Sequence, residues 1–122
     1  MENNEEFCKR NFTVRFSDCD YNSRVKLSSL FRFMEESAVA DAEENGYGLR
    51  QLIRSGYTLV LSRQKLRLTH QPLEGERLSV ETWTKSIEGK VALKDFSFKD
   101  SQGNALAQAT TSWLLISLKT GK

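Results

Sequence analysis

The stretch "VRFSDCDYNSRVKLSSLFRFMEESA", Val14–Ala38, joins a strand-like run to a helix-like run and decides the fold. Apolar and polar residues alternate from Asn11 to Asp18, which is the period of a strand with one buried face. From Leu27 onward, apolar residues recur at helical spacing, so the pattern predicts one amphipathic helix from about Ser28 to Asn45.

Sequence signals mark both ends of this predicted helix. Ser28 or Ser29 would cap its start by accepting a hydrogen bond from a free backbone amide, and "NGYG", Asn45–Gly48, supplies a left-handed stop. Asp41 and the acids after it lie near the C-terminal end, where the helix dipole disfavours negative charge, and the pattern does not explain them. "LRQLIRSG" predicts a short second helical turn that ends at Gly56.

The rest of the chain divides into four predicted strands separated by glycine-containing turns, as in antiparallel hairpins. One helix followed by a run of strands predicts an α+β domain with an antiparallel sheet across one helix face. The strands are expected at Tyr57–Thr69, Arg77–Ser86, Val91–Asp100 and Ala105–Leu118.

The apolar phase slips within the third of these four runs. Val91 and Leu93 lie on one parity, and Phe96 and Phe98 lie on the other. A bulge or strong bend near Lys94 would account for the slip. Such a sheet would curl around the helix.

Length and composition indicate one globular domain over residues 1–122, with 39% hydrophobic and 28% charged residues. Residues 1–10 are polar and acidic, so we expect a flexible N-terminus and a cytoplasmic protein without a signal peptide. We interpret Cys8 and Cys19 as reduced thiols, although a bridge between them is the alternative. A net charge of +2 is too small to indicate nucleic acid, and no membrane partner is expected.

The chain resembles the acyl-acyl-carrier-protein thioesterases of fatty-acid biosynthesis. "VETWTKSIEG" followed by "ATTSWLLISL" is the most specific part of the resemblance. The resemblance implies the hotdog fold, a curved antiparallel sheet of about five strands wrapped around one long helix. Four stretches carry it over nearly the whole chain: Val14–Ala38, Tyr57–Leu68, Gly75–Asp100 and Ala105–Lys122.

The same resemblance implies the activity and the partners. Members of the family hydrolyse fatty acyl thioesters to free acid and acyl carrier protein without a cofactor, and they carry two hotdog repeats in one polypeptide. This chain matches the first, acyl-holding repeat. It is expected to pair with a second repeat or with its own copy, because a lone sheet leaves an edge strand exposed. Two alternatives remain: a catalytically silent acyl-binding scaffold, and a self-dimerising acyl-CoA thioesterase.

The candidate catalytic residues are Asp20 and Asn22. In related single-repeat thioesterases the second aspartate of a D-C-D sequence is catalytic, and by resemblance that residue is Asp20. The catalytic repeat of the acyl-carrier-protein family has the pattern D-x-N-x-H, in which Arg24 here replaces the histidine. A guanidinium stays protonated and cannot act as a base. The alternative is that these residues only shape a turn.

The resemblance also implies an acyl-binding surface between the helix and the sheet. The same side chains would serve equally well as an ordinary core, and the sequence does not separate the two interpretations. The candidate acyl-binding residues are Leu30, Phe33, Met34, Ser37 and Trp83.

Arg63, Lys65 and Arg67 alternate along one predicted strand and therefore form a basic row on one face. This row is a candidate docking site for the acidic acyl carrier protein, or else a solvated sheet face.

Three further residues are assigned structural roles. His70 has no visible partners for a triad or a metal site and is expected in a loop, so no metal is predicted. Carboxylates beside Cys19 should raise the pKa of its thiol and disfavour a nucleophilic role. Glu36 serves either as a base on the helix or as a solvated charge, and the solvated charge is favoured.

Overall fold

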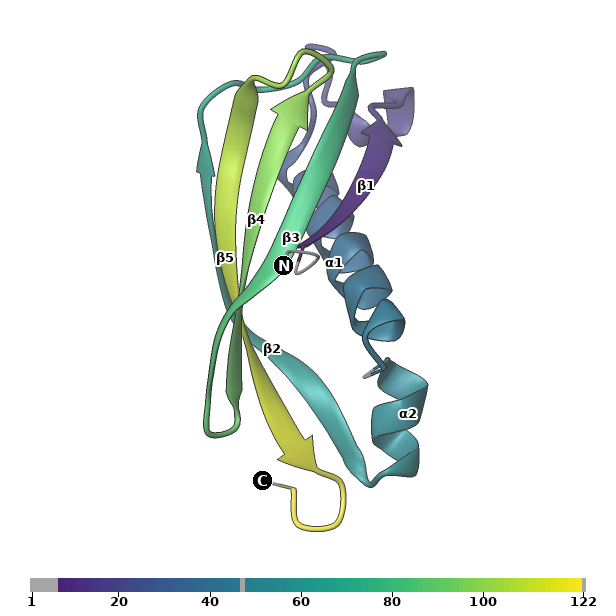
Figure 1. The fold of residues 1–122 in the computed structure, drawn as a ribbon. Helices are drawn as coiled ribbons and strands as arrows, with labels where there is room; N and C mark the ends of the chain where they lie inside the picture. Colours follow the sequence, from purple (N-terminus) through teal and green to yellow (C-terminus); the bar gives the residue numbers. More distant parts are fainter. Residues whose placement is uncertain (1–6, 47, 122) are drawn as a thin grey trace.

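The computed structural model describes residues 7–46 and 48–121. One long helix lies along one face of a curved five-stranded sheet, and a short helix follows it (Figure 1). The elements are β1 (Phe7–Thr13), a 3-10 turn η1 (Phe16–Asp18), α1 (Leu27–Glu44), α2 (Leu49–Arg54), β2 (Tyr57–Leu68), β3 (Arg77–Glu88), β4 (Val91–Asp100) and β5 (Ala105–Ser117).

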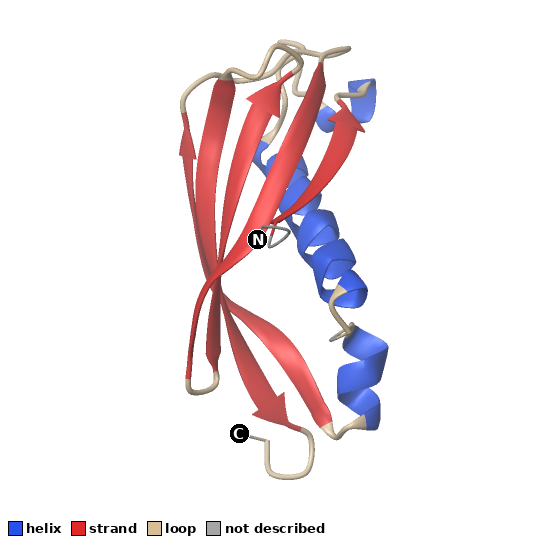
Figure 2. Ribbon diagram, viewed as in Figure 1, coloured by secondary structure: helices blue, strands red, loops and turns tan. Residues whose placement is uncertain are grey.

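The sheet is antiparallel throughout, with the strand order β1-β3-β4-β5-β2. Three consecutive strands, β3 to β5, form its centre, and β1 and β2 form its two edges (Figure 2). The chain therefore leaves one edge through α1 and re-enters the sheet at the other. This arrangement confirms the expected α+β class and the hotdog architecture.

The first strand lies earlier in the chain than the alternation from Asn11 to Asp18 predicts. The strand β1 runs from Phe7 to Thr13 and pairs with β3, whereas Phe16–Asp18 forms a 3-10 turn. The alternation of apolar residues continues into that turn but ends at Phe16, whose side chain is 80% exposed. Residues 7–10 of the expected flexible N-terminus therefore belong to the sheet, and residues 1–6 lie outside the described residues.

The long helix has the predicted extent to within one residue at each end, but the predicted cap was wrong. Lys26 occupies the cap position, and its side chain makes no capping hydrogen bond. Ser29 lies inside the first turn instead, and its amide donates to the Lys26 carbonyl at 3.1 Å.

The predicted irregularity near Lys94 lies on the neighbouring strand. The register of β3 against β4 shifts between Thr84 and Ser86, opposite Lys94 and Leu93. The apolar phase of β4 slips because Lys94 itself is buried on the helix-facing side, on the same parity as Phe96 and Phe98.

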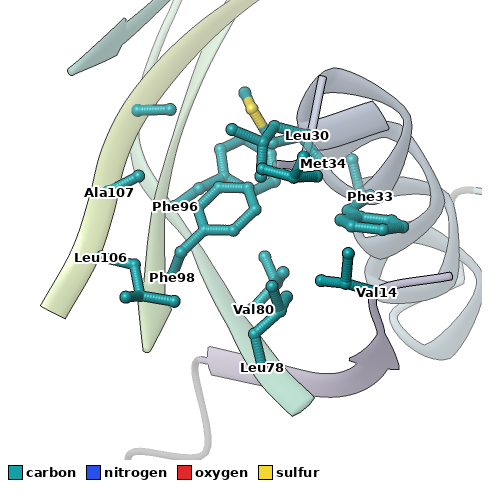
Figure 3. Packing of buried hydrophobic residues seen from close by; sticks show 13 residues of the cluster. Val14, Leu30, Phe33, Met34, Leu78, Val80, Phe96, Phe98, Leu106 and Ala107 are labelled. Carbon is teal, nitrogen blue, oxygen red and sulfur yellow. The ribbon is translucent and has the colours of Figure 1, made fainter. Parts of the chain in front are cut away.

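The hydrophobic core lies between α1 and the strands β3, β4 and β5 (Figure 3). Phe33 of the helix and Phe96 and Phe98 of β4 are at most 2% exposed. Phe12 stacks on Phe33 with ring centroids 4.4 Å apart. This packing holds the helix against the sheet and fixes the position of the strand–helix connection.

Replacement of Phe98 by alanine should destabilise the domain by about 3–5 kcal/mol, because it leaves a cavity in a close-packed core. Urea denaturation followed by circular dichroism measures the change. The exposed Phe16 provides the matched control, since Phe16→Ala should cost less than about 0.5 kcal/mol. Equal losses for the two variants would contradict the assigned core.

Candidate functional site

Asp18 anchors the connection between the first strand and the long helix. It is 4% exposed, and its carboxylate accepts hydrogen bonds from the Arg15 amide at 3.0 Å and from the Arg32 guanidinium at 2.6 Å. Its carbonyl accepts from the Lys26 amide at 2.8 Å. The aspartate thus joins η1 to the first turns of α1.

These contacts also shift the pKa of Asp18. Burial alone would raise its pKa, but the hydrogen bonds from Arg15 and Arg32 and the positive charge of Arg32 together lower the pKa below its ordinary value. Asp18 is therefore held as a carboxylate and is suited to anchoring rather than to proton transfer.

Asp20 forms a local turn. Its Oδ1 accepts hydrogen bonds from the Asn22 amide at 2.8 Å and from the Arg24 amide at 3.2 Å. The Asp20 amide donates to the Arg24 carbonyl, and Ser23 at the turn has a φ of 61°. This is the turn chemistry expected of an aspartate that bonds to its own backbone.

The other members of the predicted catalytic set lie exposed in the same turn. Asn22 and Arg24 are both exposed, and Arg24 forms a backbone bridge to Leu73. His70, the one histidine of the chain, lies exposed after β2, where its amide donates to the Leu106 carbonyl at 3.1 Å. The structure brings Asp20, Asn22 and Arg24 together as a turn without a histidine.

A groove of about 820 Å³ lies beside this connection, between β1 and the first half of α1. Glu36 lines it, but its carboxylate accepts from Arg32 at 2.6 Å, one helical turn away, and is exposed. Glu36 is thus a solvated, paired charge. The lining also includes Asn11, Thr13, Arg15, Ser17, Asp18, Lys26, Ser28 and Ser29.

The candidate acyl-binding residues separate onto two faces of the sheet. Leu30, Phe33 and Met34 are fully buried core residues, and the buried Ser37 hydroxyl donates to the Phe33 carbonyl at 2.8 Å. Trp83 does not join them. It pairs across the strands with Asp95 on the face away from α1, because the neighbouring Thr82 is the residue that faces the helix side.

The basic row lies on that same outer face. Arg63, Lys65 and Arg67 are exposed on the edge strand β2, and their partners on β5 are Ser112, Thr110 and Gln108. A shallow groove of about 360 Å³ continues from the row across the sheet; its lining includes Lys65, Arg67, Trp83, Asp95, Ser97 and Thr110.

Both cysteines are free thiols, as expected. Burial, followed by the charges of Glu74, Asp18 and Asp20, raises the pKa of Cys19. The predicted direction is confirmed, although burial is the largest cause. Cys8 is buried beside Glu44, and burial together with that carboxylate raises its pKa as well. Neither thiol is activated as a nucleophile.

Sequence reasoning missed an ion pair between Asp41 and Lys94. The two side chains are 6% and 10% exposed, and the lysine ammonium donates to the aspartate Oδ2. Asp41 is the acid that the helix-dipole argument did not explain. The sequence did contain a signal for this pair. Lys94 lies on the apolar parity of its strand, and Asp41 lies on the apolar face of its helix.

Comparison with known proteins identifies the family. The family model "Acyl-ACP thioesterase N-terminal domain" matches residues 5–122. The chain belongs to the acyl-ACP thioesterase family. No curated protein matches it. Within residues 7–46 and 48–121 of this thioesterase-family domain, no helix has the length and apolar character needed to cross a membrane.

Solved structures agree with this assignment. An acyl-ACP thioesterase from Bacteroides thetaiotaomicron is 27% identical with a TM-score of 0.94, over 97% of this chain and 49% of that one. The domain thus spans about half of that relative. Two further structures share the fold. A 12:0-ACP thioesterase from Umbellularia californica is 19% identical with a TM-score of 0.85, over 95% of this chain and 45% of that one. A 1,4-dihydroxy-2-naphthoyl-CoA thioesterase from Synechocystis is 19% identical with a TM-score of 0.86, over 95% of this chain and 86% of that one.

Replacement of Asp18 by asparagine should make the free energy of unfolding less dependent on pH. The folded-state pKa of Asp18 is lowered, so its carboxylate contributes stability above the unfolded-chain pKa, near 4, and loses it as the pH falls through the folded-state value. Asp18→Asn should therefore lower stability by about 1 kcal/mol at pH 7. The deficit should be smaller at about pH 3, below the unfolded-chain pKa.

Urea denaturation at the two pH values measures this difference. Glu36→Gln is the matched control, because it removes the exposed carboxylate that contacts the same arginine. A deficit for Asp18→Asn that is equal at both pH values would show that the charge of Asp18 does not anchor the connection.

Proposed function

We propose that this protein hydrolyses fatty acyl thioesters of acyl carrier protein, releasing free fatty acid and carrier, and that these 122 residues form the domain that holds the acyl chain. Membership of the acyl-ACP thioesterase family supports the reaction. The 27% identical Bacteroides thioesterase supports it independently, over nearly the whole domain.

The hydrogen bonds of Asp20 are the observation that supports an acyl-holding domain without the reacting groups. Its Oδ1 accepts two backbone amides of its own turn, at 2.8 and 3.2 Å, and an arginine stands where the family pattern has a histidine. Because the guanidinium stays protonated at neutral pH, Arg24 does not supply a base. The turn residues Asp20 and Asn22 therefore support the fold, and the reacting groups come from outside this domain.

Thioester hydrolysis needs an activated water or a nucleophile, and donors for the developing oxyanion. A second hotdog repeat, or a second copy of this chain, would provide them across the open edge of the sheet. Among the described residues the edge strand β2 pairs only with β5, so its other side is available for continuation of the sheet. The resulting paired assembly is the expected active form.

The basic row on β2 is the proposed contact for the acidic carrier. Arg63, Lys65 and Arg67 project from one exposed face beside the outer groove. Charge complementarity of this kind raises the rate of encounter more than it raises the final affinity. We place this reaction in the cytoplasm, as part of fatty-acid biosynthesis.

Asp20→Asn should leave acyl-ACP hydrolysis unchanged within about twofold, because asparagine forms the same backbone turn without a charge. Asp20→Ala removes the acceptor and should destabilise the domain by about 1 kcal/mol without a specific loss of kcat. Hydrolysis by the complete gene product, with acyl-ACP of several chain lengths, measures both effects.

A catalytic Asp20 makes the opposite prediction: the asparagine variant would then lose activity by orders of magnitude while it stays folded. That outcome would overturn the turn assignment. Failure of the wild-type gene product to hydrolyse any acyl-ACP would overturn the proposed reaction itself.

Replacement of Arg63, Lys65 and Arg67 by glutamate should raise KM for acyl-ACP at low ionic strength by about tenfold or more and leave kcat unchanged, because steering acts on encounter. Raising the salt concentration should reduce the difference in KM between the triple variant and the wild type. The matched control converts Lys9, Arg10 and Arg77, exposed cations near the opposite edge, to glutamate. Equal effects of the two triple variants would assign the result to net charge alone.

A further inference from the structure

The outer face of the sheet carries a line of polar and aromatic side chains that crosses four strands. The helix α1 lies against the opposite face (Figure 2). Residues opposite one another in neighbouring antiparallel strands share a face. The register of β3, β4, β5 and β2 therefore places four residues on one line: Trp83, Asp95, Thr110 and Lys65. A second line beside it runs through Glu81, Ser97, Gln108 and Arg67.

The outer groove of about 360 Å³ follows these two lines. Trp83 of β3 lines it at one end, and Lys65 and Arg67 of β2 line it at the other. Three interstrand spacings of about 4.8 Å place the backbones of Trp83 and Lys65 roughly 14 Å apart. A contact of this width, with an aromatic ring at one end and two cations at the other, suits the surface of a protein.

The indole of Trp83 offers an apolar face and a free hydrogen-bond donor. The side chain is half-buried. Among the described residues none accepts a hydrogen bond from its Nε1, whereas the Trp113 Nε1 donates to the Thr111 hydroxyl at 2.8 Å. Tryptophan is enriched at protein interfaces because it combines a large apolar area with one donor. Trp83 is therefore suited to contact with a second molecule.

The charges along the outer groove are unevenly paired. Glu81 is paired with Lys99, at a nitrogen–oxygen distance of 3.2 Å. The Asp95 carboxylate accepts a hydrogen bond from a threonine hydroxyl at 2.8 Å. Lys65 and Arg67 form no ion pair with any of the described residues. The groove thus presents two unpaired cations to solvent at the edge of the sheet.

We propose that Trp83 is the anchor residue of the contact with the acyl carrier protein. An apolar side chain within the acidic surface of the carrier packs on the indole, and carboxylates around it pair with Lys65 and Arg67. The inference rests on the proposed function, because acyl-ACP is the substrate that brings the carrier to this face. Charge complementarity selects this occupant, since an acidic protein matches the unpaired cations beside the aromatic ring.

The physical basis is the different strength of the two kinds of contact in water. Exposed ion pairs contribute little to affinity and are screened by salt. An aromatic side chain that is desolvated at the centre of an interface contributes much more of the binding free energy. The basic row should therefore govern the rate of encounter, and Trp83 should govern the lifetime of the complex.

The test measures hydrolysis by the complete gene product with two substrates. Trp83→Ala should raise KM for acyl-ACP by about tenfold or more and leave kcat unchanged, because it removes binding that the ground state and the transition state share. Acyl pantetheine carries the same thioester without the carrier protein, so its KM should stay within about twofold of the wild type. Phe16→Ala is the matched control, since it removes an 80% exposed aromatic ring that does not line the groove.

Salt separates the anchor from the basic row. A higher salt concentration should leave the effect of Trp83→Ala in place, because apolar burial is not screened. An unchanged KM for acyl-ACP in Trp83→Ala would overturn the proposal. An equal rise in KM for acyl-ACP and for acyl pantetheine would overturn it as well, because the loss would then not involve the carrier.

A photo-cross-linking group tests the contact without turnover. The complete gene product with p-benzoylphenylalanine in place of Trp83 should cross-link to purified acyl carrier protein that bears no acyl chain. The same group in place of Phe16 should give no cross-link. Absence of a cross-link from position 83, or equal cross-linking from both positions, would contradict the assigned contact.

These outcomes distinguish failure of the contact from failure of the reaction. If the carrier cross-links at position 83 and the gene product hydrolyses no acyl-ACP, the proposed function fails and the carrier contact stands. If hydrolysis occurs and Trp83→Ala has the KM of the wild type for acyl-ACP, the proposed function stands and the role of Trp83 fails.

Discussion

The ion pair between Asp41 and Lys94 ties the long helix to the centre of the sheet, and the layered structure depends on it. A buried charge without its partner costs about 3–5 kcal/mol, so neither residue tolerates separation of α1 from β4. The buried apolar side chains hold the helix against the sheet, because they interlock as a close-packed interior. The ion pair adds one directional contact between named atoms to this packing.

The helix is anchored near both of its ends by carboxylate–cation contacts of different character. At the N-terminal end, Asp18 holds Arg32 at the surface, where water weakens the attraction. At the C-terminal end, Asp41 holds Lys94 in the interior, where water is excluded. The first contact positions the strand–helix connection and its groove, and the second joins the C-terminal half of α1 to β4.

Elements with a clean period were predictable from the sequence. The helix from Leu27 to Glu44 and the four later strands follow from apolar spacing and glycine turns. The first strand was misplaced because the alternation of apolar residues runs on into Phe16, although the backbone has already turned under the control of Asp18. The ion pair was missed for a related reason: a lysine on an apolar parity interrupts the pattern, and only a partner distant in sequence explains it. Trp83 was assigned to the wrong face because a large aromatic residue suits either side of a sheet.

The role of Asp20 could not be predicted from the sequence for a chemical reason. Aspartate and asparagine two residues apart suit both a catalytic carboxylate and a backbone turn, since both roles use the same acceptor atoms. The sequence left both interpretations open at Asp20. The structure shows its Oδ1 accepting two amides of its own turn, and Arg24 beside it is a permanent cation. A carboxylate in this state shapes the approach to the helix.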